Sequence, residues 1–277
     1  MNHSYKKVLC ILLCAGVFLC LFLAFFYVFK QDASDLRPSP APDTASPQFS
    51  LPKHTLSEVH GFGEYSHLTV LPSQYTQKNE FIHQNTYEPL IALLEAAKKD
   101  GVSLKVISAY RSYHHQKQIW EDKWGSSDEA DLKKAAEILR WSSYPGTSRH
   151  HWGTDVDLNS VSFSYWNSRQ GKRTHAWLTA NAPHFGFCQT YAQGRTGGYQ
   201  DEPWHWSHLP TANHYQEKIS TADALDVILA QTVKGAAAVR TMKDTLSNHI
   251  QSISPCSPTP QAPSTNPITP SLSQKFT

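Results

Sequence analysis

Two short stretches, about fifty residues apart, carry the residue types of a catalytic metal site. The first runs from Ser148 to Asp157 (SRHHWGTDVD) and the second from Glu202 to Trp206 (EPWHW). Together they offer histidine imidazoles, aspartate carboxylates and a glutamate. A catalytic zinc ion takes three protein ligands, keeps a fourth position open for water, and needs a neighbouring base to accept that water's proton. The pair of stretches, rather than either one alone, predicts such a site.

The backbone of the first stretch indicates how separated side chains meet. Residues 154–158 alternate acidic and apolar types, which predicts a short strand with Asp155 and Asp157 on one face. His150 is an odd number of residues from Asp157, so an unbroken strand would point these two side chains to opposite faces. Gly153 tolerates backbone angles that are closed to other residues. We therefore expect a turn at Gly153 that folds His150 back over the carboxylate.

The pattern S-x-H-x-x-G-x-[A]-x-D followed by E-x-W-H resembles the VanY-like zinc D-Ala-D-Ala carboxypeptidases. These belong to a wider group that includes lysostaphin-type peptidases and the hedgehog signalling domain. The similarity extends to S-x-Y-R-S-x-x-x-Q at 108–116 and to W-L-x-x-N-A-x-x-F-G-F at 177–187, in the family's order. It covers roughly residues 80–210. One position departs from the pattern, because Asp155 stands where the wider family has alanine.

The resemblance implies a complete metal site. It implies that one zinc ion is bound by His150, Asp157 and His205, and that Glu202 is the catalytic base. We interpret Asp155 as a hydrogen-bond acceptor for one of the ligand histidines, since such partners fix the imidazole tautomer. The chain has 15 histidines, and those outside this pattern are expected to be ordinary surface or core residues.

The same resemblance implies a substrate pocket. Arg111 is the cation expected to hold the substrate's terminal carboxylate or to stabilise its carbonyl oxygen. Ser148 and Gln116 are expected to line the pocket as substrate-binding residues. The planar arginine fork can grip a carboxylate with two parallel hydrogen bonds. The substrate implied is a peptidoglycan stem peptide ending in D-alanine.

The beginning of the chain predicts a membrane location. Residues 8–29 form an uncharged, largely apolar run that follows Lys6 and Lys7. Its length suffices for one bilayer crossing, which takes about 20 residues, and the preceding lysines favour a cytoplasmic N-terminus. We expect an uncleaved, single-pass signal anchor in the cell membrane, with the catalytic domain on the outer side. A cleaved signal peptide is the competing interpretation.

Composition divides the chain into segments of different character. The five segments expected are an N-terminal transmembrane anchor at 1–30, a Pro-rich linker at 31–52, a zinc carboxypeptidase-like domain at 53–215, a C-terminal helical segment at 216–251 and a disordered Pro/Ser/Thr-rich tail at 252–277. The five cysteines include no C-x-x-C pair, which argues against a thiolate zinc site. A bridge between Cys188 and Cys256 is conceivable in an oxidising compartment. The net charge of +2 gives no electrostatic footprint for nucleic acid.

The apolar pattern indicates an α+β fold. Helices are expected at 87–100, 116–124, 128–139, 175–184 and, divided at Gly235, within 225–246. Alternating apolar residues at Val102, Leu104 and Val106 predict a strand that ends at Ala109 and delivers Arg111 just beyond its edge. We predict a single domain in which a small, mostly antiparallel sheet carries the zinc site and helices flank it.

These predictions combine into one hypothesis, a zinc-dependent D-alanyl-D-alanine carboxypeptidase that removes the terminal D-alanine from stem peptides in the cell envelope. An L,D-carboxypeptidase or a peptidoglycan endopeptidase would use the same chemistry on another bond. A catalytically idle, zinc-bearing binding module would have no use for the base Glu202. A structural anchor that recruits partners through its Pro-rich tail would leave the site residues unexplained. The sequence does not indicate the oligomeric state.

Overall fold

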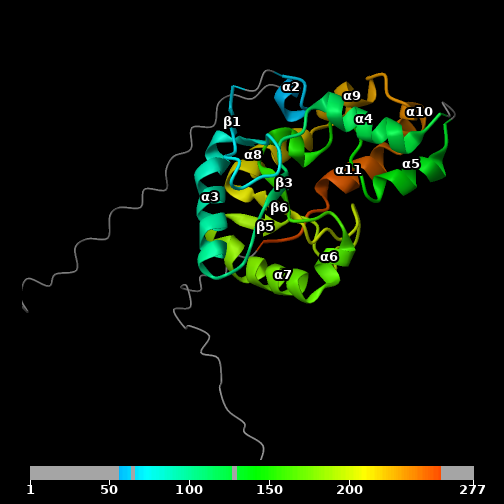
Figure 1. Ribbon diagram of the computed structural model, residues 1–277. Helices are drawn as coiled ribbons and strands as arrows, with labels where there is room; N and C mark the ends of the chain where they lie inside the picture. The colour runs from blue at the N-terminus through cyan, green and yellow to red at the C-terminus, as the bar shows by residue number, and fades with distance from the viewer. Residues whose placement is uncertain (1–55, 64–65, 127–129, 257–277) are drawn as a thin grey trace, which may run out of the picture. The chain divides into compact units, whose positions relative to one another are not determined.

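Helices surround one small central sheet in the described part of the chain (Figure 1). The structure is a computed structural model, and it describes residues 56–63, 66–126 and 130–256. All of these belong to the unit that begins at Leu51. The predicted anchor and linker lie outside the described residues. Within the described residues, no helix combines the length and apolar character that a bilayer crossing requires.

The sheet has four antiparallel strands in the order β3-β4-β6-β5. Their bounds are β3 Val106–Ser108, β4 Asp155–Leu158, β5 Phe187–Gln189 and β6 His205–His208. In the β4–β6 register, Asp157 stands opposite His205. Asp157 and His205, which belong to two different sequence motifs, therefore meet on neighbouring central strands. A separate two-stranded sheet pairs β1 Leu68–Val70 with β2 Phe81–His83.

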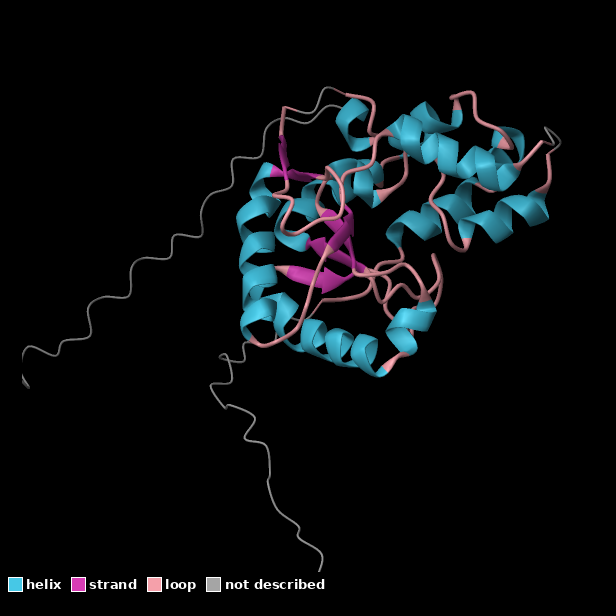
Figure 2. Ribbon diagram, viewed as in Figure 1, coloured by secondary structure: helices cyan, strands magenta, loops and turns pink. Residues whose placement is uncertain are grey.

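The helices lie around this sheet on several sides (Figure 2). They are α2 Leu56–Val59, α3 Gln84–Lys99, α4 Tyr113–Trp124, α5 Leu132–Leu139, α6 Phe163–Asn167, α7 Arg169–Asn181, α8 Leu209–Ile219, α9 Ala222–Leu229, α10 Ala236–Thr241 and α11 Lys243–Gln251, with 3-10 turns η1 Arg149–Trp152 and η2 Ala182–Phe185. The α+β prediction is confirmed, and the sheet is small and antiparallel as expected.

Two apolar cores lie within this fold. One joins the sheet to α3, and includes Val156 and Leu158 of β4 together with Leu90 and Leu93 of the helix. Strand β4 is thus buried on the face that carries Val156, which leaves its other face to carry the two aspartates. The other core gathers α4, α5 and α8–α11 around Trp120. Helix α4 therefore belongs to a different core from the strands that carry the predicted zinc ligands.

Some predicted elements begin or end at other residues. The strand expected from 102 to 109 is reduced to β3, because the backbone at 102–105 bonds elsewhere: Val102 N donates to Ala97 O at 2.8 Å, and Lys105 N to the Asn159 side chain at 2.7 Å. Helix α3 ends at Lys99, and Asp100 is its C-cap, where the sequence predicted that the helix closes. Gly235, with φ +71°, separates α9 from α10 as predicted, and an added Cβ there would lie 2.4 Å from the Trp124 ring.

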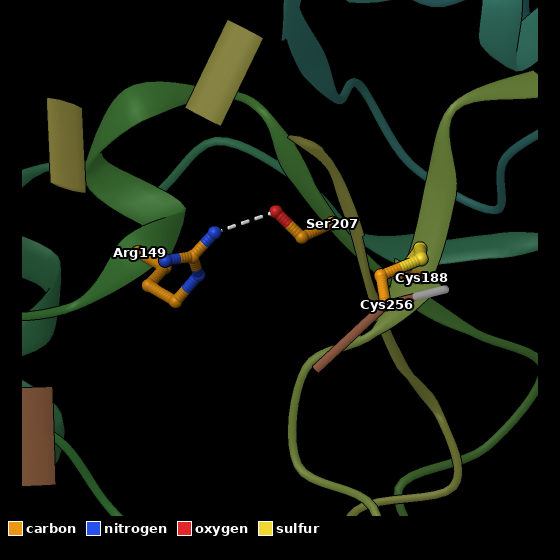
Figure 3. Close-up of a disulfide and its surroundings, with 4 residues drawn as sticks. All are labelled: Arg149, Cys188, Ser207 and Cys256. Carbon is orange, nitrogen blue, oxygen red and sulfur yellow. Dashed lines mark hydrogen bonds between the residues drawn. A yellow bond between two sulfur atoms is a disulfide. The ribbon is translucent and has the colours of Figure 1, made fainter. Parts of the chain in front are cut away.

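The segment after α11 differs from the predicted disordered tail, which was placed from residue 252 onward. Residues 252–256 run beside β5, where Ser254 N donates to Thr190 O at 2.8 Å. Ala192 N in turn donates to Ser254 Oγ at 2.8 Å. A disulfide between Cys188 and Cys256 closes this contact (Figure 3). The proline-rich composition of the tail did not predict these bonds, because they depend on a segment of the chain that is 68 residues away in sequence.

Candidate active site

The three predicted zinc ligands meet in the structure. His150 from η1, Asp157 from β4 and His205 from β6 each offer a ligand atom, and these atoms lie within 4.8 Å of one another. All three side chains are buried. Among the described residues, this is the one group of histidine, cysteine and acidic side chains with the geometry to hold a metal ion.

A tight turn brings His150 over the strand. Residues 149–152 form a 3-10 turn, and Gly153 ends it in the left-handed region at φ +67°. A Cβ on Gly153 would lie 2.7 Å from the side chain of Leu68 and 2.9 Å from the backbone of His83, so both space and conformation require glycine. The turn predicted at Gly153 is confirmed. It removes the alternation that would otherwise have pointed His150 away from Asp157.

Hydrogen bonds select which nitrogen of each histidine faces the cluster. His150 Nδ1 donates to the carbonyl oxygen of Ala109 at 2.6 Å, which turns Nε2 toward Asp157 Oδ2 at 3.3 Å. His205 Nε2 donates to Asp155 Oδ1 at 3.0 Å, which turns Nδ1 toward Asp157 Oδ1 at 3.2 Å. Each imidazole therefore has an acceptor behind it that fixes its tautomer, the usual arrangement for a metal ligand. Asp155 lies where the sequence placed it, behind a ligand histidine.

The donor set fits zinc. A tetrahedral zinc ion with bonds of about 2.0–2.1 Å separates its ligand atoms by about 3.3 Å. His150 Nε2 lies 3.3 Å from Asp157 Oδ2, and His205 Nδ1 lies 3.2 Å from Asp157 Oδ1, so both imidazoles reach the carboxylate at about that spacing. Asp157 is buried, so neither oxygen is taken up by bulk solvent. Two imidazole nitrogens and one carboxylate oxygen, without a thiolate, make a zinc site of the catalytic kind.

The ionised carboxylates of the cluster favour the binding of a cation. Burial raises the pKa of Asp157, but His150 and His205 outweigh burial and hold that pKa well below its ordinary value. Burial raises the pKa of Asp155 as well, but Arg149, His205 and the Thr154 hydroxyl together outweigh burial, so the net shift is also downward. Both carboxylates are therefore ionised at neutral pH. Burial lowers the pKa of His205, yet the two carboxylates reverse this effect and raise it to about 9.

Arg149 is a site residue that the sequence analysis missed. Its Nε donates to Asp155 Oδ1 at 2.8 Å, and its Nη2 donates to Ser207 Oγ at 2.7 Å (Figure 3). The guanidinium also lies 4.7 Å from the centre of the Trp152 ring. This buried cation balances the extra carboxylate that distinguishes the motif. The sequence offered one signal for this role, since Arg149 and the unusual Asp155 occur in the same short motif and could form an ion pair.

His151 illustrates why the neighbouring histidine is not a ligand. Its Nδ1 donates to Arg111 O at 2.6 Å, and its Nε2 accepts from Gly146 N at 3.1 Å. Both ring nitrogens are therefore occupied by backbone groups. Burial lowers the pKa of His151 to about 3, which keeps the ring neutral. The expectation that His151 is an ordinary core residue agrees with these contacts.

Glu202, the predicted base, lies beside the cluster without replacing a ligand. Its Oε2 is 3.6 Å from His205 Nδ1, the nitrogen that faces Asp157. Its backbone is held by Glu202 N donating to Tyr191 O at 2.8 Å. Burial raises the pKa of Glu202 to about 7, and the opposing attraction of His205 is smaller. A carboxyl with such a pKa is suited to exchanging protons near neutral pH.

Arg111, the predicted substrate cation, is aimed at the cluster by its neighbours. Its Nη1 donates to Gln116 Oε1 at 2.8 Å and its Nη2 to Ser108 Oγ at 3.1 Å. Nη2 also lies 3.8 Å from Asp157 Oδ2. Gln116 is completely buried and does not line the cavity, so its predicted pocket-lining role is corrected. It instead holds the guanidinium and anchors it to Ser143 O, to which Gln116 Nε2 donates at 2.8 Å.

One cavity is lined by the three zinc ligands, the base Glu202 and the cation Arg111. Its volume is about 500 Å³, within the range of small-molecule sites. Its lining includes the three ligands together with Arg111, Ser148, Glu202 and several aromatic side chains. Ser148 lies in this lining as predicted. The arrangement places a cation site, a proton acceptor and a guanidinium around a single space, which is what hydrolysis of a substrate with a negatively charged end requires.

Comparison with known proteins agrees with this chemistry. Residues 79–211 match the family model VanY, D-alanyl-D-alanine carboxypeptidase. A D-alanyl-D-alanine carboxypeptidase from Enterococcus faecalis is 29% identical over 211 residues, which cover 68% of this chain and 77% of that protein.

Solved structures of vancomycin-resistance proteins are also similar. The D,D-pentapeptidase VanY from the VanB-type resistance cassette, in complex with Zn(II), is 28% identical with a TM-score of 0.40, covering 53% of this chain and 88% of that one. VanYB in complex with D-alanine-D-alanine is 28% identical with a TM-score of 0.42, covering 55% of this chain and 83% of that one. The motif order, the metal cluster and the family-model match agree: residues 79–211 of this chain resemble the VanY-like D-alanyl-D-alanine carboxypeptidases, and the chain is a peptidase that acts on D-Ala-D-Ala.

Proposed function

We propose that this protein is a zinc-dependent D,D-carboxypeptidase that removes the terminal D-alanine from peptidoglycan stem peptides. The observation that carries the proposal is that Glu202 and Arg111 both flank the His150–Asp157–His205 cluster within one cavity. A binding module would need the metal for its structure alone. A peptidase also needs a proton acceptor and a group that recognises the end of the peptide, and both are present.

Glu202 would accept and donate the proton that moves during the reaction. Zinc bound by the three ligands would supply Lewis acidity toward a water molecule and the scissile carbonyl. Glu202 accepts a proton from that water as the water oxygen attacks the carbonyl carbon. It then delivers the proton to the amide nitrogen as the carbon–nitrogen bond breaks, so that free D-alanine leaves as an amine. The distance of 3.6 Å between Glu202 Oε2 and the ligand atom of His205 keeps the carboxylate beside the reacting atoms.

Arg111 would select the chain end. Its bonds to Gln116 and Ser108 use one hydrogen of each terminal nitrogen and fix the plane of the guanidinium. The remaining hydrogens are available for the terminal carboxylate of the substrate. Ser148, also in the cavity lining, can add a neutral hydrogen bond. This arrangement favours an exopeptidase over an endopeptidase, because an internal bond offers no carboxylate at that position.

The L,D-carboxypeptidase remains the second candidate, because it would use the same base and the same grip on a free carboxylate. The two activities differ only in the residue before the scissile bond, which is D-alanine in one case and an L-centre in the other. The cavity groups named here do not distinguish these two centres. Parallel digestion of pentapeptide and tetrapeptide separates them directly.

We propose further that the domain works at the outer face of the cell membrane, where stem peptides are. The Cys188–Cys256 disulfide supports an oxidising compartment, since structural disulfides are rare in the cytosol. The apolar run at 8–29 supports a membrane attachment. The full-length protein is expected to sediment with membranes, and external protease is expected to release the domain. A protein that stays protected from protease in intact cells would contradict this location.

Glu202→Gln tests the proposed chemistry, because the amide keeps the size of the side chain but cannot accept a proton. We expect D-alanine release from a pentapeptide to fall by at least ~10²-fold while zinc content stays near one equivalent. Glu217→Gln is the matched control, because Glu217 is exposed on α8 and lies outside the cavity lining. Normal turnover in Glu202→Gln would show that another group is the base.

A further inference from the structure

The mouth of the active-site cavity exposes an unusual amount of apolar surface. Seven large apolar side chains are exposed among the described residues, and three of them, Trp141, Val161 and Phe163, line this one cavity. Their exposed fractions are 41%, 59% and 36%. Phe163 lies edge to face with Trp141, with ring centres 5.9 Å apart, and with Trp204, with ring centres 5.1 Å apart. Contiguous exposed apolar surface of this kind marks a binding site.

A cation stands in the same cavity. Lys123, in the last turn of α4, lines the space and forms no ion pair with another described residue. By contrast, Lys117 on the same helix pairs with Glu121 at 2.6 Å. Burial and Arg111 lower the pKa of Lys123, while Glu202 raises it, so the lysine senses both site residues. Lys123 thus places a positive charge in the cavity lining, where it can attract a negatively charged group of a bound substrate.

The cavity has two parts with different chemistry. We call the zinc ligands with Glu202 and Arg111 the inner wall; the outer wall comprises Lys123, Trp141, Val161, Phe163 and Trp204. A terminal D-Ala-D-Ala unit is served by the inner wall, whose arginine takes the carboxylate. A volume of about 500 Å³ is of the size that encloses a drug-sized ligand, which is larger than a dipeptide. The outer wall is therefore left for the part of the peptide that precedes the terminal dipeptide.

We propose that the outer wall binds the side chain of the residue before D-Ala-D-Ala and selects one that is aliphatic along its length and carries a carboxylate at its tip. A diamino-dicarboxylic residue such as diaminopimelate has this chemistry, because its tip carries a carboxylate beside the ammonium group, whereas the tip of lysine carries the ammonium group alone. The aromatic side chains would pack against the methylene groups, and Lys123 would pair with the carboxylate. A lysine side chain would bring a net positive charge toward Lys123 and Arg111 without a carboxylate to offset it. This inference rests on the proposed function for the identity of the terminal dipeptide.

Binding to a slow variant tests the selection separately from catalysis. Three pentapeptides that differ only at the third residue, with diaminopimelate, its side-chain amide or lysine, are titrated calorimetrically into zinc-loaded Glu202→Gln protein. We expect the free acid to bind roughly fivefold to tenfold more tightly than the other two, as a partly exposed charge pair provides. Adding Lys123→Met should bring the ratio close to one, because methionine keeps the aliphatic stem without the charge. Lys133→Met on α5 is the control, since Lys133 is exposed outside the cavity lining.

The outcomes separate this inference from the proposed function. Equal binding of the three peptides, or a preference that survives Lys123→Met, would overturn the selection by the outer wall. A preference for the side-chain amide or for peptides carrying a sugar would assign the aromatic surface to another part of the substrate, and would also overturn it. Selective binding of the acid together with no cleavage of any pentapeptide by the unmutated protein would leave the inference standing and refute the carboxypeptidase function.

Discussion

The inner and outer walls of the cavity are built in opposite ways. On the inner wall, each ligand is buried and is held from behind, His150 by a backbone carbonyl and His205 by Asp155, which Arg149 holds in turn. On the outer wall, Trp141 and Phe163 are substantially exposed, and Phe163 lies edge to face with both Trp141 and Trp204. Chemistry needs fixed atoms at distances of about 3 Å, whereas recognition of a side chain tolerates adjustment. The same cavity therefore combines a rigid reactive part with an adaptable selective part.

The strand arrangement explains the rigidity of the inner wall. Asp157 and His205 face each other on adjacent central strands, so neither can move without breaking ladder hydrogen bonds. Lys123 comes instead from the last turn of α4, which packs in the other apolar core, and Arg111 precedes the N-cap of that helix, Ser112. Variants on the two walls are expected to differ in kind: inner-wall changes should alter metal binding and turnover, and outer-wall changes should alter substrate affinity.

Removing a ligand should have the largest effect. In His150→Ala or His205→Ala, two protein ligands remain where catalytic zinc sites use three. We expect zinc content well below one equivalent and D-alanine release at background, measured by elemental analysis and by amino-acid detection. His184→Ala is the control, because His184 is exposed on η2 and lies outside the cavity lining. Full zinc content in both ligand variants would contradict the assignment of His150 and His205 as zinc ligands.

Changing the acceptor behind His205 should have the next largest effect. Asp155→Asn keeps the shape of the side chain but loses the charge that the imidazole and Arg149 both contact. We expect zinc affinity to fall by roughly 10–100-fold, measured by competition with a chromophoric chelator. Affinity equal to that of the unmutated protein would mean that Asp155 serves only to neutralise Arg149.

The pH dependence of metal binding follows from the raised pKa of His205. With a pKa of about 9 in the metal-free protein, His205 is protonated at pH 7, and a metal ion must displace that proton. Affinity should therefore rise with pH, by about tenfold per unit below pH 9, and fall as pH decreases. Calorimetry in buffers of different ionisation enthalpy should detect release of about one proton at pH 7. Binding without proton release would contradict this electrostatic account.

The smallest effect is expected on the outer wall. Trp141→Ala removes half-exposed apolar surface and its edge contact with Phe163. Such aromatic pairs contribute about 0.5–1.5 kcal/mol, so we expect KM to rise roughly twofold to tenfold with kcat and zinc content unchanged. Steady-state kinetics on a pentapeptide measure both quantities. A fall in kcat without a change in KM would show that the two walls are not separate in function.

The contrast between the walls also separates what the sequence predicted from what it did not. The inner wall was predicted because its residues lie in two short motifs whose spacing reflects local turns, such as the turn at Gly153. Trp141, Phe163 and Lys123 come from three separate segments, the residues after α5, helix α6 and helix α4, and only the tertiary fold brings them to one cavity. No spacing rule connects them. Gln116 was misplaced for a similar reason, since a motif gives a residue's neighbourhood but not the direction of its side chain.

The fold was predicted to a similar extent. Long helices with regular apolar spacing, such as α3, were found with nearly correct ends. Strand β4, Asp155–Leu158, was also found within one residue of its prediction, but β3 was predicted too long, because the ends of a three-residue strand depend on the hydrogen-bond partners that long-range packing supplies. The Cys188–Cys256 disulfide was conceivable from the sequence, but the ordered segment that it holds against β5 depended on pairing with Thr190 and Ala192.

The most direct test of the central claim is a mass-spectrometric time course of a pentapeptide ending in D-Ala-D-Ala, compared with its C-terminal amide. We predict the loss of a single D-alanine from the free acid, little or no change in the amide, and no reaction in the presence of a zinc chelator. Retention of the pentapeptide with trimming of the corresponding tetrapeptide would establish the L,D activity instead. Internal cleavage of the amide, or cleavage that persists with chelator, would contradict the account of Arg111 and of the metal cluster.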